Sequence, residues 1–295
     1  METRALTLLL LGAVACDPNV VDAVREPPPV VAPPDMTPDM TPDMTPDMTP
    51  VSPLQSSLIH RYSFDGEGTE ALDSKFSAHG EIVGASLTGT GSLQLAGAKS
   101  LQYVNLPNPL ISGLTNATFE AWLTWNGGSG WQRIFDFGSS AGGKDPYPPA
   151  DAPPEGPTTF SGTSYLFLTT NAGLDSNRPY PAGLRVAYSH NGVADEDVCY
   201  GDEQPFPKGG EHHVAVVVDA DAQTIALYQD GALVDECPLT RPLSAIKDVN
   251  NWLGRSNYTA DPELEGTYDE FRIYSAALTA SEIADSFKAG PDATP

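Results

Sequence analysis

The chain has 295 residues, of which 15 are basic and 39 are acidic, so its formal net charge is -24 at pH 7. So few cations cannot form a basic patch, and this excludes nucleic acid as the expected partner. An acidic surface keeps an exported protein soluble, and it is also compatible with cation binding.

The first segment, residues 1–16, has the pattern of an export signal. Arg4 precedes an apolar run from Ala5 to Ala15, which is too short to cross a bilayer. The sequence Ala13-Val14-Ala15-Cys16 resembles a bacterial lipobox, although Leu is usual where Ala13 stands. We therefore expect Cys16 to become the lipidated first residue of a mature protein. An ordinary signal peptide cut after Ala15 is the alternative.

Residues 17–55 predict a disordered linker. Four tandem copies of Asp-Met-Thr-Pro occupy Asp35 to Pro50. Proline at every fourth position blocks both helix and sheet, and little apolar surface is available to bury. At about 3 Å per residue, such a linker reaches on the order of 100 Å. We interpret it as a spacer that holds the following domain away from a membrane surface.

Residues 56–290 predict a single β domain, followed by a tail at 291–295. Short apolar or alternating runs are bounded by Gly and Pro, with almost no helical periodicity before residue 275. This pattern predicts an all-β, antiparallel two-sheet sandwich. The expected strands include 58–64, 101–106, 119–125, 131–137, 165–168, 184–189, 214–218, 224–229, 232–237 and 252–255.

The closing segment, residues 264–290, predicts a strand followed by a short helix. Strict alternation would place Asp269, Phe271 and Ile273 on one face of the strand. The sequence Thr279-Ala280-Ser281-Glu282 is a capping box that predicts a helix start.

That helix should bury one face and end at a glycine. Leu278 and Ile283 occupy the two positions of a hydrophobic staple. Ile283 and Phe287 are four residues apart and should share the buried face. Gly290 and Pro291 form a stop signal.

Four segments together carry a family resemblance. They are His60 to Gly66, Phe119 to Trp122, His212 to Gly231, and the closing Asp269-Glu270-Phe271-Arg272-Ile273-Tyr274. In this order they resemble a laminin G-like domain of the concanavalin A-like jelly-roll class. The resemblance implies a jelly roll, but this fold hosts lectins, adhesion modules and glycosidases alike.

The resemblance also implies a calcium ion near the meeting point of the first and last strands. Its expected ligands are Asp65, Asp73 and Asp269, with backbone carbonyls completing the shell. Oxygen ligands of this kind suit calcium better than a transition metal. The alternative is that Asp65 caps a turn beside Gly66 and that Asp269 accepts backbone hydrogen bonds.

Cys199 and Cys237 form an even pair within the predicted exported domain. An oxidising compartment favours a Cys199–Cys237 disulfide. Two free thiols are the alternative.

The sequence lacks the catalytic motifs of this fold. No Glu is followed by Asp two positions later, so the Glu-x-Asp-x-x-Glu motif of the glucanase branch is absent. No His-Glu-x-x-His motif occurs either. We therefore expect a protein that is not an enzyme. A carbohydrate-active hydrolase with an unfamiliar carboxylate pair is the alternative.

The leading hypothesis is a non-catalytic module that binds a glycan or a protein at the cell surface. The expected location is the cell envelope, through a lipid anchor only, with ordinary secretion as the alternative. A structural surface domain stiffened by calcium is a further hypothesis. Aromatic and cationic residues in or near loops are the candidate ligand contacts: Trp125, Trp131, Tyr147, Arg178, Tyr180 and Tyr258.

Overall fold

The computed structural model describes residues 53–145, 159–172, 183–201 and 204–293. Cys16, Tyr147, Arg178 and Tyr180 lie outside the described residues. Within these ranges, no helix is both long enough and apolar enough to cross a membrane.

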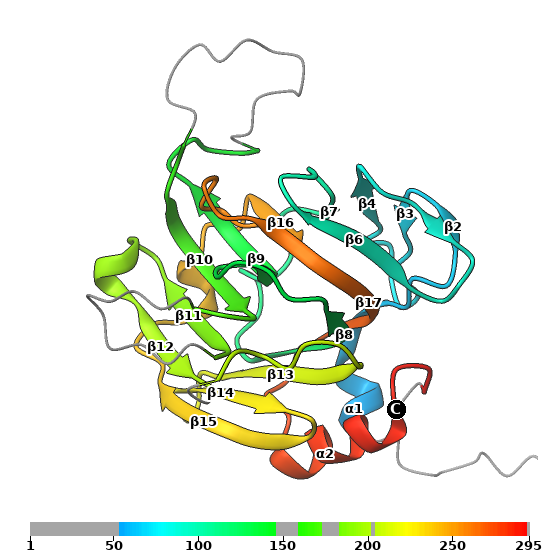
Figure 1. The fold of residues 1–295 in the computed structure, drawn as a ribbon. Helices are drawn as coiled ribbons and strands as arrows, with labels where there is room; N and C mark the ends of the chain where they lie inside the picture. Colours follow the sequence, from blue (N-terminus) through cyan, green and yellow to red (C-terminus); the bar gives the residue numbers. More distant parts are fainter. Residues whose placement is uncertain (1–52, 146–158, 173–182, 202–203, 294–295) are drawn as a thin grey trace, which may run out of the picture. The chain divides into compact units, whose positions relative to one another are not determined.

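Two antiparallel sheets make up the domain (Figure 1). One has seven strands: β1 (Leu58–Tyr62), β17 (Glu263–Tyr274), β8 (Ala117–Trp125), β13 (His212–Asp219), β14 (Thr224–Gln229) and β15 (Ala232–Pro238) in order, with β6 (Leu93–Ala98) also paired to β17. The other has eight: β12 (Asp197–Tyr200), β11 (Arg185–Ser189), β10 (Gly162–Thr169), β9 (Arg133–Ser140), β16 (Asn250–Leu253), β7 (Tyr103–Leu106), β4 (Gly80–Val83) and β3 (Glu70–Ala71). A small pair joins β2 (Glu67–Gly68) to β5 (Leu87–Thr88). The predicted antiparallel two-sheet β-sandwich is confirmed.

The core lies between the inner faces of the two sheets. Because side chains alternate along a strand, each strand supplies the core with every second residue. On β10, Leu166 and Leu168 join the main core. Tyr165 and Phe167 belong to a separate small cluster on the opposite face of the same strand. The eight-stranded sheet therefore presents a second, outer surface that carries aromatic side chains.

Strand β17 organises the seven-stranded sheet. It pairs with β8 on one side, and with β6 and then β1 on the other. The register shifts between Tyr268 and Glu270, so that Asp269 is an extra residue in a β-bulge. Tyr268, Phe271 and Ile273 all lie in the core. The predicted alternation was wrong at Asp269, which does not share the core face.

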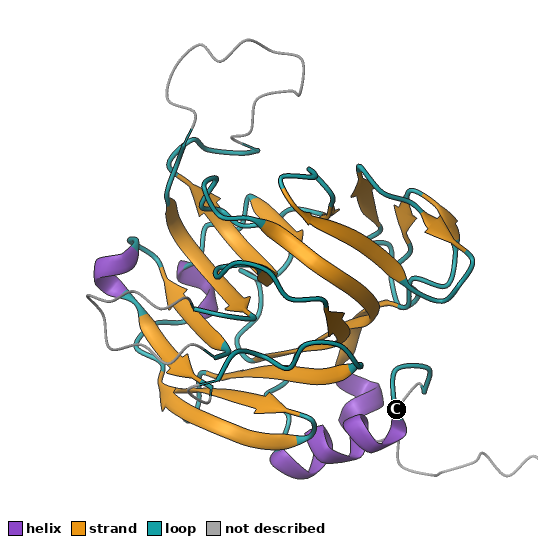
Figure 2. Ribbon diagram, viewed as in Figure 1, coloured by secondary structure: helices purple, strands orange, loops and turns teal. Residues whose placement is uncertain are grey.

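Among the described residues the helices are few and short (Figure 2). They are α1 (Pro53–Ser57), α2 (Ala280–Ala289) and two 3-10 turns, η1 (Val193–Asp195) and η2 (Leu243–Ala245). The capping box of α2 is confirmed: the Thr279 amide donates to Glu282 Oε2 at 2.8 Å, and the Glu282 amide donates to Thr279 Oγ1 at 3.3 Å. The staple residues Leu278 and Ile283 are both buried in one cluster.

Phe287 departs from the prediction. Ile283 is fully buried, but Phe287 is 40% exposed. Its ring covers Gly231, where an added Cβ would lie 2.7 Å from Phe287 Cδ1. Ser286 takes the inner position instead, and its hydroxyl donates to the buried Glu120 at 2.9 Å.

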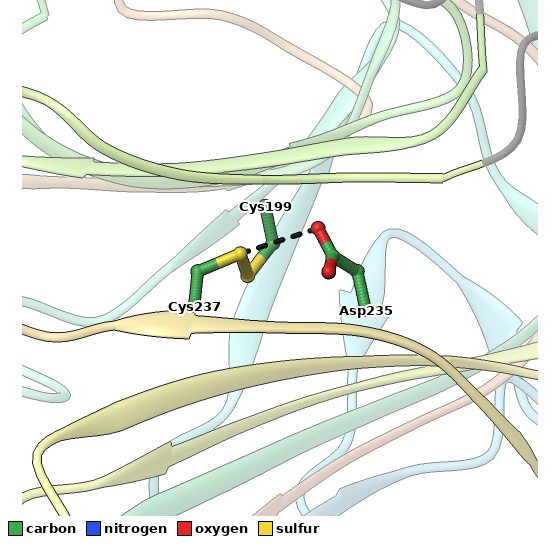
Figure 3. A group of neighbouring side chains, drawn as sticks. All are labelled: Cys199, Asp235 and Cys237. Carbon is green, nitrogen blue, oxygen red and sulfur yellow. Dashed lines mark hydrogen bonds between the residues drawn. A yellow bond between two sulfur atoms is a disulfide. The ribbon is translucent and has the colours of Figure 1, made fainter.

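The predicted disulfide is present (Figure 3). Cys199 lies on β12 and Cys237 lies on β15, with their Cα atoms 5.6 Å apart. Each strand is the last of its sheet, so the bond joins an edge of one sheet to an edge of the other. Strand β12 itself was not predicted, because its residues follow an acidic cluster without apolar alternation.

Candidate functional site

A small hollow opens on the outer face of the eight-stranded sheet, over β9, β10 and β11. Its volume is about 140 Å³. We call it the β9–β11 pocket. Three aromatic rings, two arginines, two carboxylates and one aliphatic side chain line it: Trp131, Phe167, Tyr258, Arg133, Arg185, Glu196, Asp261 and Val193.

Strand register brings the two arginines together. Thr169 on β10 pairs with Arg133 on one side and with Arg185 on the other. Directly paired residues have side chains on the same face, so both arginines project toward the pocket. Phe167 lies two residues before Thr169 and shares this face. Its ring centroid is 4.0 Å from the guanidinium carbon of Arg133 and 5.8 Å from that of Arg185. The two cations therefore stack around one aromatic ring.

Each arginine is paired with a carboxylate. Arg133 Nη2 lies 2.8 Å from Asp261 Oδ2, and Arg185 Nη2 binds Glu196 Oε2. The two arginines are only 1% and 3% exposed. A buried charge without a partner is strongly unfavourable, so these pairs hold all four side chains in place.

A chain of hydroxyl groups supports Glu196. The Tyr258 hydroxyl donates to the Tyr165 hydroxyl at 3.0 Å, and the Tyr165 hydroxyl donates to Glu196 Oε1 at 2.6 Å. Burial, together with the hydrogen bond to Glu196, raises the pKa of Tyr165 far above its usual range. Burial also raises the pKa of Tyr258. Both phenols therefore remain neutral hydrogen-bonding groups, and the Tyr258 ring is fixed at the pocket.

A buried aspartate pins the loop that carries Tyr258 and Asp261. Asp136 accepts from the Asn257 amide at 2.9 Å and from Asn257 Nδ2 at 2.8 Å. The Ser256 hydroxyl lies within hydrogen-bond distance of both Asp136 and Asp261. Burial raises the pKa of Asp136 and of Asp261, and Arg133 opposes that shift in both.

Trp131 has an unusual backbone conformation at the pocket. Its φ angle is 69°, which is rare for a bulky side chain and occurs where the surroundings enforce it. The Trp131 amide donates to the Asn171 carbonyl at 2.7 Å, and the Trp131 carbonyl accepts from Arg133 Nη1 at 2.9 Å. The half-buried indole is thus held in one place.

The structure places the described candidate ligand-binding residues in different surroundings. Trp131 and Tyr258 both line the β9–β11 pocket. Trp125 does not, because it is 4% exposed and packs in the main core. Its Nε1 donates to Gln132 Oε1 at 3.1 Å. Trp125 therefore lies in the core and not at the pocket. The predictions for Tyr147, Arg178 and Tyr180 concern residues outside the described ranges.

The sequence analysis did not identify five of the residues that line the pocket: Arg133, Phe167, Arg185, Glu196 and Asp261. One signal was available in the run Trp131-Gln132-Arg133-Ile134-Phe135-Asp136-Phe137. There Arg133 and Asp136 interrupt an apolar strand, and charged residues within a buried strand often mark a functional face.

The three predicted calcium ligands have different surroundings. Asp65 is exposed. Asp73 is 2% exposed, and its two oxygens accept from His60 Nδ1 and from the amides of Arg61, Lys75 and Ala78, at 2.8 to 3.2 Å. Burial alone would raise its pKa, but the hydrogen bonds from His60, Lys75 and Arg61 outweigh burial and lower the pKa to about 2. These contacts already use the Asp73 oxygens that calcium would need.

Asp269 belongs to another acidic group. Burial raises its pKa to about 7, with further contributions from Glu211 and Asp292, and Asp269 shares a side-chain hydrogen bond with Glu211. In the part of the chain that the structure describes, one set of His, Cys, Asp or Glu side chains has three ligand atoms within 4.8 Å of one another, namely Cys199, Asp235 and Cys237. The disulfide consumes both of those sulfurs (Figure 3). The structure therefore does not gather Asp65, Asp73 and Asp269 into one such cluster, and calcium binding stays a prediction.

A family model described as the concanavalin A-like lectin/glucanases superfamily matches residues 98–284. No curated protein matches the sequence.

Three solved structures illustrate the likeness in fold. Domain 4 of AbnA, an extracellular GH43 arabinanase from Geobacillus stearothermophilus determined in complex with arabinotriose, is 20% identical with a TM-score of 0.54, and the match covers 78% of this chain and 97% of that one. Trypanosoma rangeli sialidase is 17% identical with a TM-score of 0.53, covering 79% of this chain and 33% of that one. The Ruminococcus gnavus IT-sialidase CBM40, bound to α2,3-sialyllactose, is 11% identical with a TM-score of 0.50, covering 66% and 95%. This chain thus spans only about a third of the trypanosome enzyme.

Proposed function

Because the chain belongs to the concanavalin A-like lectin/glucanases superfamily, we propose that it is a non-catalytic module that binds glycans through the β9–β11 pocket. The observation that carries this proposal is the rigid combination of Trp131, Tyr258 and paired arginine and carboxylate groups on an outer sheet face. Small-molecule sites of this kind join apolar and aromatic walls to a few fixed polar groups.

The chemistry of the pocket suits a sugar. The aromatic rings of Trp131 and Tyr258 offer apolar surface for the C–H faces of a sugar ring. The carboxylate of Glu196, held in place by Arg185, offers an acceptor for sugar hydroxyls. Two structural neighbours, the arabinanase domain and the CBM40 module, were determined with an oligosaccharide bound, and this supports the proposal.

The two pocket carboxylates favour binding over catalysis. A glycosidase needs one acid that holds a proton and one carboxylate that attacks or activates water. Glu196 and Asp261 are each tied to a buried arginine. These ion pairs fix both carboxylates against the arginines as hydrogen-bond acceptors. The alternative of a hydrolase predicts release of reducing sugar from a glycan that the protein retains.

The proposal also includes export. Residues 1–16 carry the pattern of a signal peptide, and Cys16 stands at the expected position for lipidation. The proline-rich segment from 17 to 55 then holds the domain away from the membrane, where it can reach surface glycans. Mass spectrometry of the mature protein tests this part, since a lipid on Cys16 supports the anchor and an unmodified N-terminus near that point contradicts it.

Affinity electrophoresis of the full-length protein on a polysaccharide panel tests glycan binding. We expect retention on at least one glycan, and we expect Trp131→Ala to abolish it. Phe76→Ala is the matched control, because Phe76 is 65% exposed and does not line the pocket. Equal retention of the Trp131 variant and the wild type would show that the pocket is not the site.

A further inference from the structure

The charges lining the β9–β11 pocket cancel. Two buried guanidiniums, those of Arg133 and Arg185, face two carboxylates, those of Asp261 and Glu196. A third carboxylate, that of Asp136, is fully buried beside them, with its Oδ2 3.4 Å from Arg133 Nε. The pocket therefore carries no surplus of positive charge.

An acidic sugar would have to compete for the arginines. Recognition of a carboxylate by arginine is strongest when two nitrogen atoms of one guanidinium bind it together. In Arg133, Nη2 binds Asp261 and Nη1 donates to the Trp131 carbonyl. In Arg185, Nη2 binds Glu196. A ligand carboxylate could displace these partners only by leaving the half-buried Asp261 or Glu196, and the site around it, without its paired cation, which is unfavourable.

The same groups accept an uncharged sugar without any displacement. The carboxylate oxygens of Glu196 keep lone pairs that can accept from hydroxyl groups while the ion pair stays intact. Trp131 and Tyr258 supply apolar surface, and Val193, which is 46% exposed, extends that surface at the pocket. A volume of about 140 Å³ admits one ring or one chain end rather than a longer segment.

The charge of the whole protein acts in the same direction. With a net charge of -24, the chain repels polyanions at a distance, so a polyanionic glycan would meet a barrier before reaching the pocket. From these observations we infer that the β9–β11 pocket takes a single uncharged sugar ring, a neutral pentose or hexose, in preference to a sialic or uronic acid. This inference rests on the proposed glycan-binding function.

Pairs of related neutral and acidic probes test the inference. Methyl-esterified pectin against pectate, and lactose against sialyllactose, are suitable pairs, with arabinan as a further neutral probe. Retention and titration calorimetry with the full-length protein should show binding to a neutral probe that is at least tenfold tighter than to any acidic one. Binding to the neutral probe should also be unchanged between low and high salt, because no ion pair with the ligand is formed.

The outcomes separate the inference from the function on which it rests. Tighter binding to pectate or sialyllactose, weakening as salt rises, would overturn the inference and leave glycan binding intact. No retention on any glycan, neutral or acidic, would overturn both. Glu196→Gln removes one negative charge from the pocket, and we expect it to raise the relative affinity for the acidic member of each pair severalfold. If that variant does not fold, the salt dependence of the wild-type protein decides.

Discussion

The guanidinium of Arg133 stacks on the ring of Phe167 while it bridges Asp261 and the Trp131 carbonyl. The Arg133 side chain therefore connects three pocket residues, Phe167, Asp261 and Trp131. Lysine has a single charged nitrogen and cannot reproduce the planar guanidinium group, which binds several partners at once.

We expect Arg133→Lys to lower the free energy of unfolding by about 2–4 kcal/mol, because it weakens a buried ion pair and a stacked contact. Glycan retention should fall at least tenfold. Arg241→Lys is the control, since Arg241 forms an ion pair with Asp195 and is 28% exposed at its side chain. Exposed pairs contribute about 0–1 kcal/mol. Denaturant titration measures the free energy of unfolding of the two variants. Equal losses of unfolding free energy in both would contradict the role of Arg133.

The raised pKa of Asp269 predicts that the stability of the protein falls as the pH rises toward neutrality. Burial and the neighbouring Glu211 raise its pKa to about 7 from the ordinary 3.8. Between about pH 4 and pH 7 the folded protein holds a proton that the unfolded chain has released, so this group lowers stability as pH rises through that range. Below about pH 4 the carboxyl is protonated in both states and contributes nothing.

Asp269→Asn should therefore stabilise the protein at neutral pH. We expect a gain of about 1 kcal/mol, much less than the full shift implies, because the group is partly exposed to solvent. The gain should shrink toward zero as the pH is lowered to 4. Asp285→Asn on the exposed side of α2 is the control and should change little. Thermal unfolding at several pH values gives the answer, and a loss of stability at pH 8 in the Asp269 variant would count against this account.

Asp73 should behave in the opposite way. Hydrogen bonds lower its pKa to about 2, so its contribution to stability is complete above about pH 4 and is lost as the pH falls through 2. Asp73→Asn replaces one acceptor by a donor that faces His60 or a backbone amide. We expect a loss of about 2–4 kcal/mol at pH 7.

The exposed Asp65 supplies the control for that variant, since Asp65→Asn should cost little. The same unfolding experiment with a chelator checks the calcium prediction for Asp65, Asp73 and Asp269. If the chelator leaves the melting temperature unchanged, calcium does not stabilise this domain.

Much of the fold was predictable because its signals are local. The alternation of side chains along 119–125, the continuous apolar run at 214–218 and the capping box at Thr279 all depend on residues a few positions apart. The β-bulge at Asp269 was not predictable in this way. A bulge is defined by the register against β8, and nothing within residues 264–274 marks the inserted residue.

The site depended on pairing that no local pattern reveals. Arg133 and Arg185 are 52 residues apart in the sequence and meet only because both pair with Thr169. Trp125 and Trp131 flank the same glycine-rich turn and look equivalent in the sequence. The inner face of β8 takes Trp125 into the core, and the hydrogen bonds of Asn171 and Arg133 hold Trp131 at the pocket.

The disulfide between Cys199 and Cys237 gives the last prediction. It closes a loop across 38 positions of the sequence and joins edge strands β12 and β15 of the two sheets. On the chain-entropy model, removing such a loop closure costs roughly 3–4 kcal/mol, because the unfolded chain regains freedom. We expect Cys199→Ser combined with Cys237→Ser to lower the denaturation midpoint accordingly. The wild type should lose the same amount of stability when a reductant is added, while the double variant should not respond.

Glu196 lies close in sequence to Cys199 and lines the pocket, so glycan retention should also weaken if β12 detaches from β15. A double variant with the midpoint of the wild type would show that hydrogen bonding and packing alone hold these two edges together.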